Sequence, residues 1–277
     1  MRRVSPRLLE VSRDLRDAAL RSVSRLEGLV RRDGELIPPA HLRRYYYRTF
    51  GRRAYVRACE TARTEVMIHG LRPEHDVLDI GCGVGNLAVG ILDYLTGAYA
   101  GVDVNREAID WCGRAITARC RTFTFHHADV YNEAYNRRGA IDPAQFTFPF
   151  PAGRFDFAFA GSLFTHLLPD SAERYISEIA RLLRPSGVCV ASFFLLNRET
   201  RTGVEAGRSF LPYAHGHPSG RCRLMSNEKP EAAVALEEGF VRAALERAGL
   251  RVGDVRRGRW WSGGQDDQDV LTIHPAT

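Results

Sequence analysis

The sequence predicts an α/β protein with a seven-stranded, mostly parallel sheet, a C-terminal antiparallel hairpin and a helical N-terminal extension. Three observations lead to this fold class. Short apolar runs alternate with helical periodicity from about position 75 onward, which is typical of a parallel sheet covered by helices on both faces. The last two runs are joined by a segment too short for a helix. The first seventy residues show helical periodicity alone. We therefore divide the chain into an extension, 1–70, and an α/β domain, 71–277.

Seven apolar segments are the expected strands, at 76–81, 99–104, 121–127, 154–161, 187–195, 250–257 and 269–274. Helical patterns between them fall at 84–96, 106–119, 170–184 and 236–248. Two segments, 131–153 and 196–235, are longer than the connections that such an alternation of strands and helices requires. Loops of this length in a compact domain are usually functional, so we expect the insertion at 196–235 to contribute to a ligand site.

The extension carries the basic charge of the chain. Apolar residues at steps of three and four predict an amphipathic, arginine-rich helix at 5–32, and a second basic segment at 41–67 is also helical in pattern. Residues 1–63 contain 16 arginines against 7 acidic residues, whereas the rest of the chain is slightly acidic. The overall net charge of +6 is therefore local, and only Lys229 among the 39 basic residues is a lysine. This bias indicates genomic base composition more than phosphate binding, so we disfavour a nucleic-acid partner.

Composition narrows the class of protein further. The 277 residues, 44% of them hydrophobic, suit one large globular domain with a full core. Six cysteines show neither a CxxC pair nor zinc-like spacing, which is typical of reduced thiols in the cytoplasm. No apolar run approaches the length of a membrane span, and the first residues lack the apolar stretch of a secretory signal. We expect a cytoplasmic protein.

The segment VLDIGCGVGNLA, residues 77–88, is a strand, a glycine-rich turn and the start of a helix. Gly81, Gly83 and Gly85 allow a tight turn and a close approach of the backbone to a ligand. Their G-x-G-x-G spacing differs from the G-x-G-x-x-G of dinucleotide-binding turns. Asp79 precedes the first glycine, where a carboxylate repels a pyrophosphate but attracts an α-amino group.

This segment resembles motif I of the class I S-adenosylmethionine-dependent methyltransferases, which have a Rossmann-like fold. The resemblance continues in order through residues 70–195 and implies S-adenosylmethionine as methyl donor and S-adenosylhomocysteine as product. It places Asp103, followed by Val104, at the ribose hydroxyls. It places Asp129 at the adenine amino group with Val130 beside the ring. The fourth strand, which contains Ala160, then lines the methyl-donor end of the pocket.

His166 is the candidate catalytic residue, because it follows the fourth strand where the resemblance places the donor methyl. Methyl transfer to a hydroxyl benefits from a general base, and imidazole titrates near neutrality. The alternative is a histidine that only shapes the pocket. His126 and His127, in the third strand, are interpreted as structural.

Four residues outside the motifs are candidates for acceptor binding. His215 and His217 lie in the insertion, and each either lines the acceptor pocket or lies on the surface of the insertion without a role in binding. Trp260, next to Trp261, is either an apolar platform for the acceptor or a core residue. Tyr47 belongs to the basic segment, which by resemblance caps the donor pocket; a solvated helix packed on the core is the alternative.

We expect an O-methyltransferase acting on a hydroxyl of a carbohydrate or other secondary metabolite. A methyltransferase of RNA or of a peptide or protein, using the basic N-terminal region, is the second hypothesis, and a donor-binding protein without catalysis is the third. No metal-ligand spacing is evident, although a divalent ion held by separate loops stays open. The amphipathic N-terminal helix suggests a homodimer contact.

Overall fold

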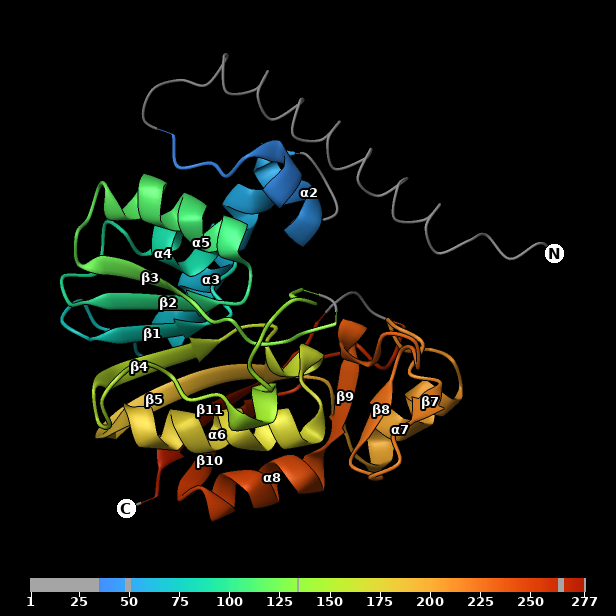
Figure 1. Ribbon diagram of the computed structural model, residues 1–277. Helices are drawn as coiled ribbons and strands as arrows, with labels where there is room; N and C mark the ends of the chain where they lie inside the picture. Colours follow the sequence, from blue (N-terminus) through green and yellow to red (C-terminus); the bar gives the residue numbers. More distant parts are fainter. Residues whose placement is uncertain (1–34, 48–50, 134, 264–266, 277) are drawn as a thin grey trace.

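The computed structural model describes residues 35–47, 51–133, 135–263 and 267–276. The helix predicted at 5–32, and with it the predicted dimer contact, lies outside the described residues. Within them, the first helices are α2 (Ala40–Tyr47) and α3 (Arg52–Ile68). These two helices belong to the predicted basic extension and pack beside the large sheet (Figure 1).

The large sheet confirms the predicted fold class. Its strands are β1 (Val77–Ile80), β2 (Tyr99–Asp103), β3 (Phe123–His127), β4 (Phe155–Ala160), β5 (Leu183–Phe193), β10 (Leu250–Arg256) and β11 (Asp269–Pro275). They lie in the order β10-β11-β5-β4-β1-β2-β3. The first five strands pair in parallel, whereas β11 is antiparallel to both β5 and β10, as expected for the C-terminal hairpin.

Helices cover both faces of the sheet because side chains alternate along each buried strand. Leu78 and Ile80 pack in a core cluster with α6 (Pro169–Leu182) and α8 (Glu238–Arg247). Val77, one position away, belongs to a second cluster with α3, α4 (Asn86–Gly90) and α5 (Arg106–Cys112). Figure 1 shows the two helical layers on either side of the strands.

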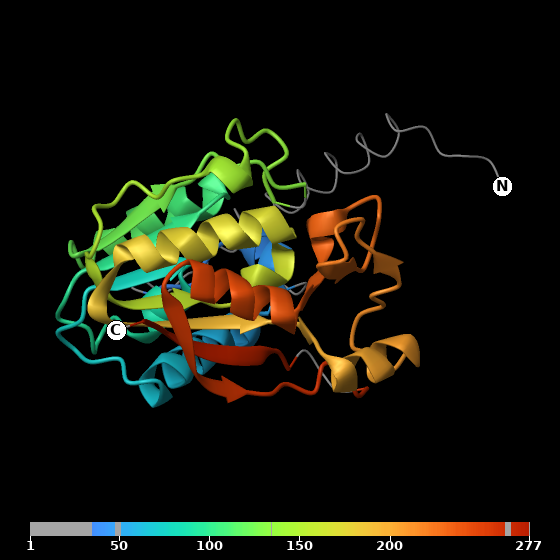
Figure 2. The same cartoon turned by 90° about the horizontal axis from the view of Figure 1, so that it is seen from below.

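The insertion is not the loop that its length suggested. It forms a second sheet of four short strands in the order β6-β9-β8-β7. Its elements are β6 (Leu195–Leu196), α7 (Arg198–Glu205), β7 (His215–Gly216), β8 (Cys222–Leu224), the 3-10 turn Pro230–Ala232 and β9 (Val234–Glu237). It stands beside one end of the large sheet in both views (Figures 1 and 2). Strands of two to four residues are too short to show a periodic pattern in the sequence.

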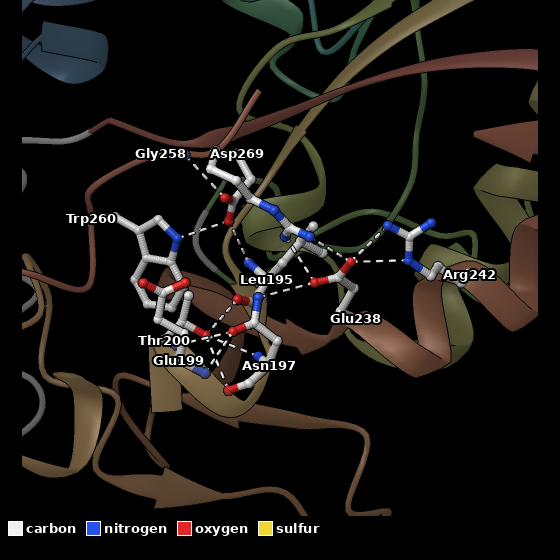
Figure 3. Close-up of polar contacts among 10 residues, drawn as sticks. Leu195, Asn197, Glu199, Thr200, Glu238, Arg242, Gly258, Trp260 and Asp269 are labelled. Carbon is white, nitrogen blue, oxygen red and sulfur yellow. Dashed lines mark hydrogen bonds and ion pairs between the residues drawn. The ribbon is translucent and has the colours of Figure 1, made fainter. Parts of the chain in front are cut away.

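A buried polar cluster joins the second sheet to the first, as Figure 3 shows. The carboxylate of Asp269, at the start of β11, is fully buried and accepts hydrogen bonds from the backbone of Leu195 (3.0 Å) and of Gly258 (3.0 Å). It also accepts from the indole nitrogen of Trp260 at 2.8 Å. Burial raises the pKa of this carboxyl, although the three donors oppose the shift.

Glu238, at the start of α8, extends the cluster shown in Figure 3. It accepts hydrogen bonds from Arg257, Arg242 and Asn197, and the Arg257 contacts are the main reason that its pKa falls to about 2. A cluster of this kind fixes the position of the insertion relative to β5 and β11.

Candidate active site

A cavity of about 1090 Å3 lies at the carboxyl ends of the parallel strands and extends along α3. Ligands of open α/β sheets bind at this edge, where the loops after neighbouring strands meet. The walls come from the turn after β1, the ends of β2 and β3, the loop after β4, the insertion and α2.

The glycine turn forms one wall as predicted. Gly81, Gly83 and Gly85 all have positive φ angles, +79°, +52° and +69°. At Gly83 a β-carbon would come within 2.9 Å of the ring of Tyr46. Gly85 does not line the cavity; its missing side chain leaves room for Ile116, whose Cδ1 would stand 2.7 Å from a β-carbon. Gly81 and Gly83 line the cavity, and the missing side chains of Gly83 and Gly85 leave room for Tyr46 and Ile116.

Asp103, the residue predicted at the ribose hydroxyls, lines the cavity. One oxygen accepts the Gly83 backbone N–H at 2.8 Å. The other accepts the Asn105 backbone N–H at 2.7 Å and, more weakly, the hydroxyl of Tyr46 at 3.4 Å. Burial raises the pKa of Asp103, and these hydrogen bonds partly oppose the rise.

Asp79 lies elsewhere than predicted. It is buried within β1, does not line the cavity, and accepts a hydrogen bond from the hydroxyl of Tyr99. Burial raises its pKa to about 7. The reason is the alternation along the strand: Ile80 lines the cavity, so the neighbouring Asp79 points to the opposite face, toward Tyr99. The expected contact between Asp79 and an α-amino group is therefore corrected.

Of the remaining residues predicted at the donor end, some line the cavity and others do not. Val104 and Val130 line the cavity. Asp129 is exposed and Ala160 is fully buried, and neither lines it. Their neighbours take these places, Ala128 and Val130 after β3 and Gly161 after β4. After β3 the predicted Val130 lines the cavity and the predicted Asp129 does not, and after β4 Gly161 lines it in place of the predicted Ala160.

His166 lines the cavity from the short 3-10 turn Phe164–His166. Its Nδ1 lies 3.0 Å from the backbone carbonyl oxygen of Glu231. A carbonyl only accepts, so Nδ1 carries the proton and the neutral ring keeps Nε2 as its proton acceptor. The hydroxyl of Tyr135 donates to Nε2 at 3.3 Å. The ring is thus held in the tautomer that a general base at Nε2 requires.

Tyr135 and Glu231 were not predicted from the sequence. Tyr135 lies in the 131–153 segment and Glu231 in the insertion, both without a periodic pattern. Glu231 contacts His166 through its backbone carbonyl. Because every residue has a backbone carbonyl, the residue type at this position could not predict the contact. Its own carboxyl is buried, accepts the backbone N–H of Glu133 and has a pKa raised by burial to about 7.

Three polar side chains meet at the cavity where β4, β5 and β11 lie side by side. Ser192 donates to Gln268 at 2.6 Å, and Gln268 donates to the hydroxyl of Ser162 at 2.9 Å. The backbone N–H of Ser162 donates to Ser192 at 2.7 Å. Ser162 has a φ of +54°, and every other described residue with a positive φ is a glycine. Strained backbone of this kind is typical of functional sites.

Three of the predicted acceptor-binding residues lie away from the cavity. His215 lies in β7, the outer strand of the small sheet, and His217 follows that strand; they hydrogen bond to Asn227 and Ser219, respectively. Trp260 is fully buried against Phe194 and does not line the cavity either. These predictions are corrected, because the small sheet turns β7 outward and Trp260 fills its core.

The helix α2 covers the donor end. Tyr45, Tyr46 and Tyr47 all line the cavity. Tyr47 donates a hydrogen bond to Asn86, directly after the glycine turn, so it lies at the donor end of the cavity. Among the described residues no group of three or more histidine, cysteine or acidic side chains is arranged to hold a metal ion. No helix in the described ranges is long and apolar enough to cross a membrane.

Part of the sequence matches a known protein-family model. Residues 77–187 match the family model described as a methyltransferase domain. The matched segment contains the glycine turn, Asp103, the loop after β4 and His166.

One curated relative of this segment is named as a sterol methyltransferase. Sterol 24-C-methyltransferase ERG6B from Gibberella zeae is 30% identical over 125 residues, which are 43% of this chain and 27% of that protein. The chain thus spans about a quarter of the length of this curated relative.

Two solved structures are similar in fold. The PH0226 protein from Pyrococcus horikoshii has a TM-score of 0.55 and 15% identity, with 79% of this chain and 90% of that chain covered. The 1,6-didemethyltoxoflavin-N1-methyltransferase from Burkholderia thailandensis, solved with S-adenosylhomocysteine, has a TM-score of 0.52 and 21% identity, with 80% of each chain covered.

Proposed function

We propose that this protein is an S-adenosylmethionine-dependent methyltransferase that methylates a hydroxyl group of a small-molecule acceptor, a carbohydrate or another secondary metabolite. His166 is the proposed general base. The observation that carries the proposal is one cavity lined both by Asp103 and by His166, whose Nδ1 contacts the Glu231 carbonyl so that Nε2 is left to accept a proton.

The donor end suits the parts of S-adenosylmethionine. Asp103 offers a carboxylate to the two ribose hydroxyls, and Val104, Ala128 and Val130 offer apolar surface to the adenine. The contact of Asp103 with the Tyr46 hydroxyl is the longest of its three, so a ribose hydroxyl replaces it at the least cost. The cavity exceeds the roughly 300–1,000 Å3 of a pocket for one small ligand, which leaves room for a second molecule.

The donor supplies a methyl group on a positively charged sulfur, a leaving group that needs no activation. The residues at the other end therefore act on the acceptor. The hydroxyl oxygen forms the new bond to the methyl carbon, the carbon–sulfur bond breaks with its electron pair left on sulfur, and Nε2 of His166 takes the hydroxyl proton. The carbonyl of Glu231 then stabilises the charged imidazolium through Nδ1.

Tyr135 orients the ring in this mechanism. Its hydroxyl occupies Nε2 before the acceptor binds, and its ring packs edge-on against His166 with centroids 5.2 Å apart. The acceptor hydroxyl takes the place of the Tyr135 hydroxyl on Nε2.

Transfer of tritiated methyl from S-adenosylmethionine to fractionated cell extract tests the proposal. We expect label in the small-molecule or glycan fraction, as an ether that resists mild alkali. Asp103→Ala serves as the control with impaired donor binding. Label in RNA or protein would replace the proposed acceptor class, and alkali-labile label would indicate a carboxylate acceptor. No label in any fraction, with donor binding intact, would favour a protein that binds the donor without catalysis.

A further inference from the structure

The cavity is surrounded by large apolar side chains that face solvent. Four of the six most exposed large hydrophobic residues in the described ranges line it: Tyr45 (41% exposed), Ile68 (63%), Tyr131 (40%) and Phe210 (44%). The other two, Val56 and Ile141, do not line it. Exposed apolar side chains gathered around a cavity indicate a binding surface for an apolar ligand.

Hydrogen bonds of the neighbouring backbone hold Phe210 in its exposed position at the cavity. Its backbone N–H donates to the carbonyl of Trp260, a residue fully buried in the core of the small sheet. The neighbouring Ser209 hydroxyl donates to the carbonyl of Leu211 at 2.7 Å, and Leu211 also lines the cavity. The insertion therefore holds an aromatic side chain at the cavity by contacts to its own core.

Aromatic rings continue from the rim to the proposed base. Tyr45 and Tyr135 meet edge-on with ring centroids 5.9 Å apart, and Tyr135 meets His166 in the same way at 5.2 Å. A flat ring system between the rim and His166 would find aromatic faces and edges along its path, the geometry that ring pairs prefer.

The polar groups at the acceptor end already bond to one another. Ser162, Ser192 and Gln268 form the cluster described above, and the hydroxyl of Thr165 donates to the carbonyl of Ser162 at 3.1 Å. A sugar has a hydroxyl on nearly every carbon, and each one buried without a partner costs free energy. This lining offers such a molecule few new partners.

The charged groups are also paired. Arg256 lies 2.8 Å from Glu65 and 3.8 Å from Asp267, and all three line the cavity. Apart from Asp103 at the donor end, these are the charged aspartate, glutamate and arginine side chains among the described lining residues. An anionic acceptor would have to compete with two carboxylates for Arg256.

We propose that the acceptor is a neutral, largely apolar molecule with a flat ring system and a hydroxyl group, which narrows the proposed function from a carbohydrate or another secondary metabolite to the second of these. The apolar ring system follows from the rim and the paired lining. The hydroxyl rests on the proposed function, because it is the group that His166 would deprotonate.

Binding of α-naphthol, a neutral flat molecule with one hydroxyl, tests the proposal without requiring methyl transfer. Calorimetry on the full chain saturated with S-adenosylhomocysteine compares α-naphthol with methyl glucoside. We expect α-naphthol to bind and the glucoside not to bind. Phe210→Ser should weaken α-naphthol binding about tenfold through the lost apolar contact. Ile141→Ser, an equally exposed residue away from the cavity, is the matched control and should leave binding unchanged.

Glucoside binding equal to or tighter than α-naphthol binding would overturn the proposal, as would the absence of binding by either probe. Equal effects of Phe210→Ser and Ile141→Ser would also overturn it, because binding would then be non-specific. The failure of the proposed function is distinguishable: α-naphthol would bind as expected while tritiated methyl reached no hydroxyl in any fraction.

Discussion

The two ends of the cavity are built differently. The donor end comes mainly from one stretch, residues 80–130, in which each βα turn adds its own side chain or backbone groups, and α2 covers it. The acceptor end is assembled from distant segments, such as Tyr135, His166, Phe210 and Gln268. The donor end therefore depends on local turn geometry, whereas the acceptor end depends on how the insertion is fixed to the large sheet.

The first prediction removes the contact that fixes the insertion. Asp269→Ala leaves three buried N–H donors without their acceptor, and each costs about 1–3 kcal/mol. We expect the free energy of unfolding in urea to fall by about 4 kcal/mol. Asp254→Ala, an exposed residue of the same hairpin, is the control and should change it by less than about 0.5 kcal/mol. A loss below about 1 kcal/mol for Asp269→Ala would mean that the cluster does not hold the two sheets together.

The second prediction concerns the buried carboxyl beside the proposed base. The pKa of Glu231 is raised from 4.5 to about 7 in the folded protein. The free energy of unfolding therefore falls as the pH rises from about 4.5 through 7, because the folded protein keeps a proton that the unfolded chain releases. Glu231→Gln keeps an acceptor for the Glu133 N–H but cannot ionise. We expect the variant to gain about 2 kcal/mol over the wild type at pH 8, and nothing at pH 4.5. Urea unfolding across this range measures the difference, and a gain independent of pH would contradict the account.

The third prediction tests the close approach at the donor end. Gly83→Ala places a methyl group against the Tyr46 ring, so we expect S-adenosylhomocysteine to bind about tenfold more weakly. Gly153 has a similar positive φ, +62°, but no atom near its missing side chain and no place in the cavity. Gly153→Ala should therefore carry the same backbone strain and leave the affinity unchanged. Equal losses in the two variants would show that strain, and not approach to the ligand, explains Gly83.

The fourth prediction has the smallest effect and concerns Tyr135. Tyr135→Phe removes the hydrogen bond that orients the His166 ring before the acceptor binds and keeps the ring contact, so we expect kcat/KM to fall about fivefold, the effect of one neutral hydrogen bond. The pH profile of kcat/KM, which reports the free enzyme, should shift as well, since the hydroxyl acts on the titrating ring. Tyr94→Phe, whose hydroxyl bonds to the carbonyl of Leu71 and which does not line the cavity, should leave kcat/KM unchanged. A fall in kcat/KM without a shifted profile would reduce Tyr135 to a packing role.

The comparison also explains how much was predictable. The order of strands and helices, the glycine turn and Asp103 follow from local patterns, because each lies within a few residues of the strand that positions it. Asp79 was misplaced although the motif was recognised. A buried strand shows apolar residues on both faces, so its sequence does not say which face meets the cavity.

The acceptor end was less predictable for another reason. His215, His217 and Trp260 carry side chains that suit a binding site, but the packing of the small sheet decides where they point. Glu231 contributes a backbone carbonyl, which every residue has. His166 was found because it follows β4 by a few residues, within the segment that matches the methyltransferase family model.

Measuring two quantities on two variants tests the division between the ends most directly. S-adenosylhomocysteine affinity by calorimetry and methyl turnover are determined for Asp103→Asn and His166→Gln. We expect Asp103→Asn to weaken S-adenosylhomocysteine binding about tenfold or more. We expect His166→Gln to leave that affinity unchanged while turnover falls about 10²-fold. If His166→Gln weakened S-adenosylhomocysteine binding as much as Asp103→Asn, or left turnover intact, the proposed separation of donor binding from base catalysis would be wrong.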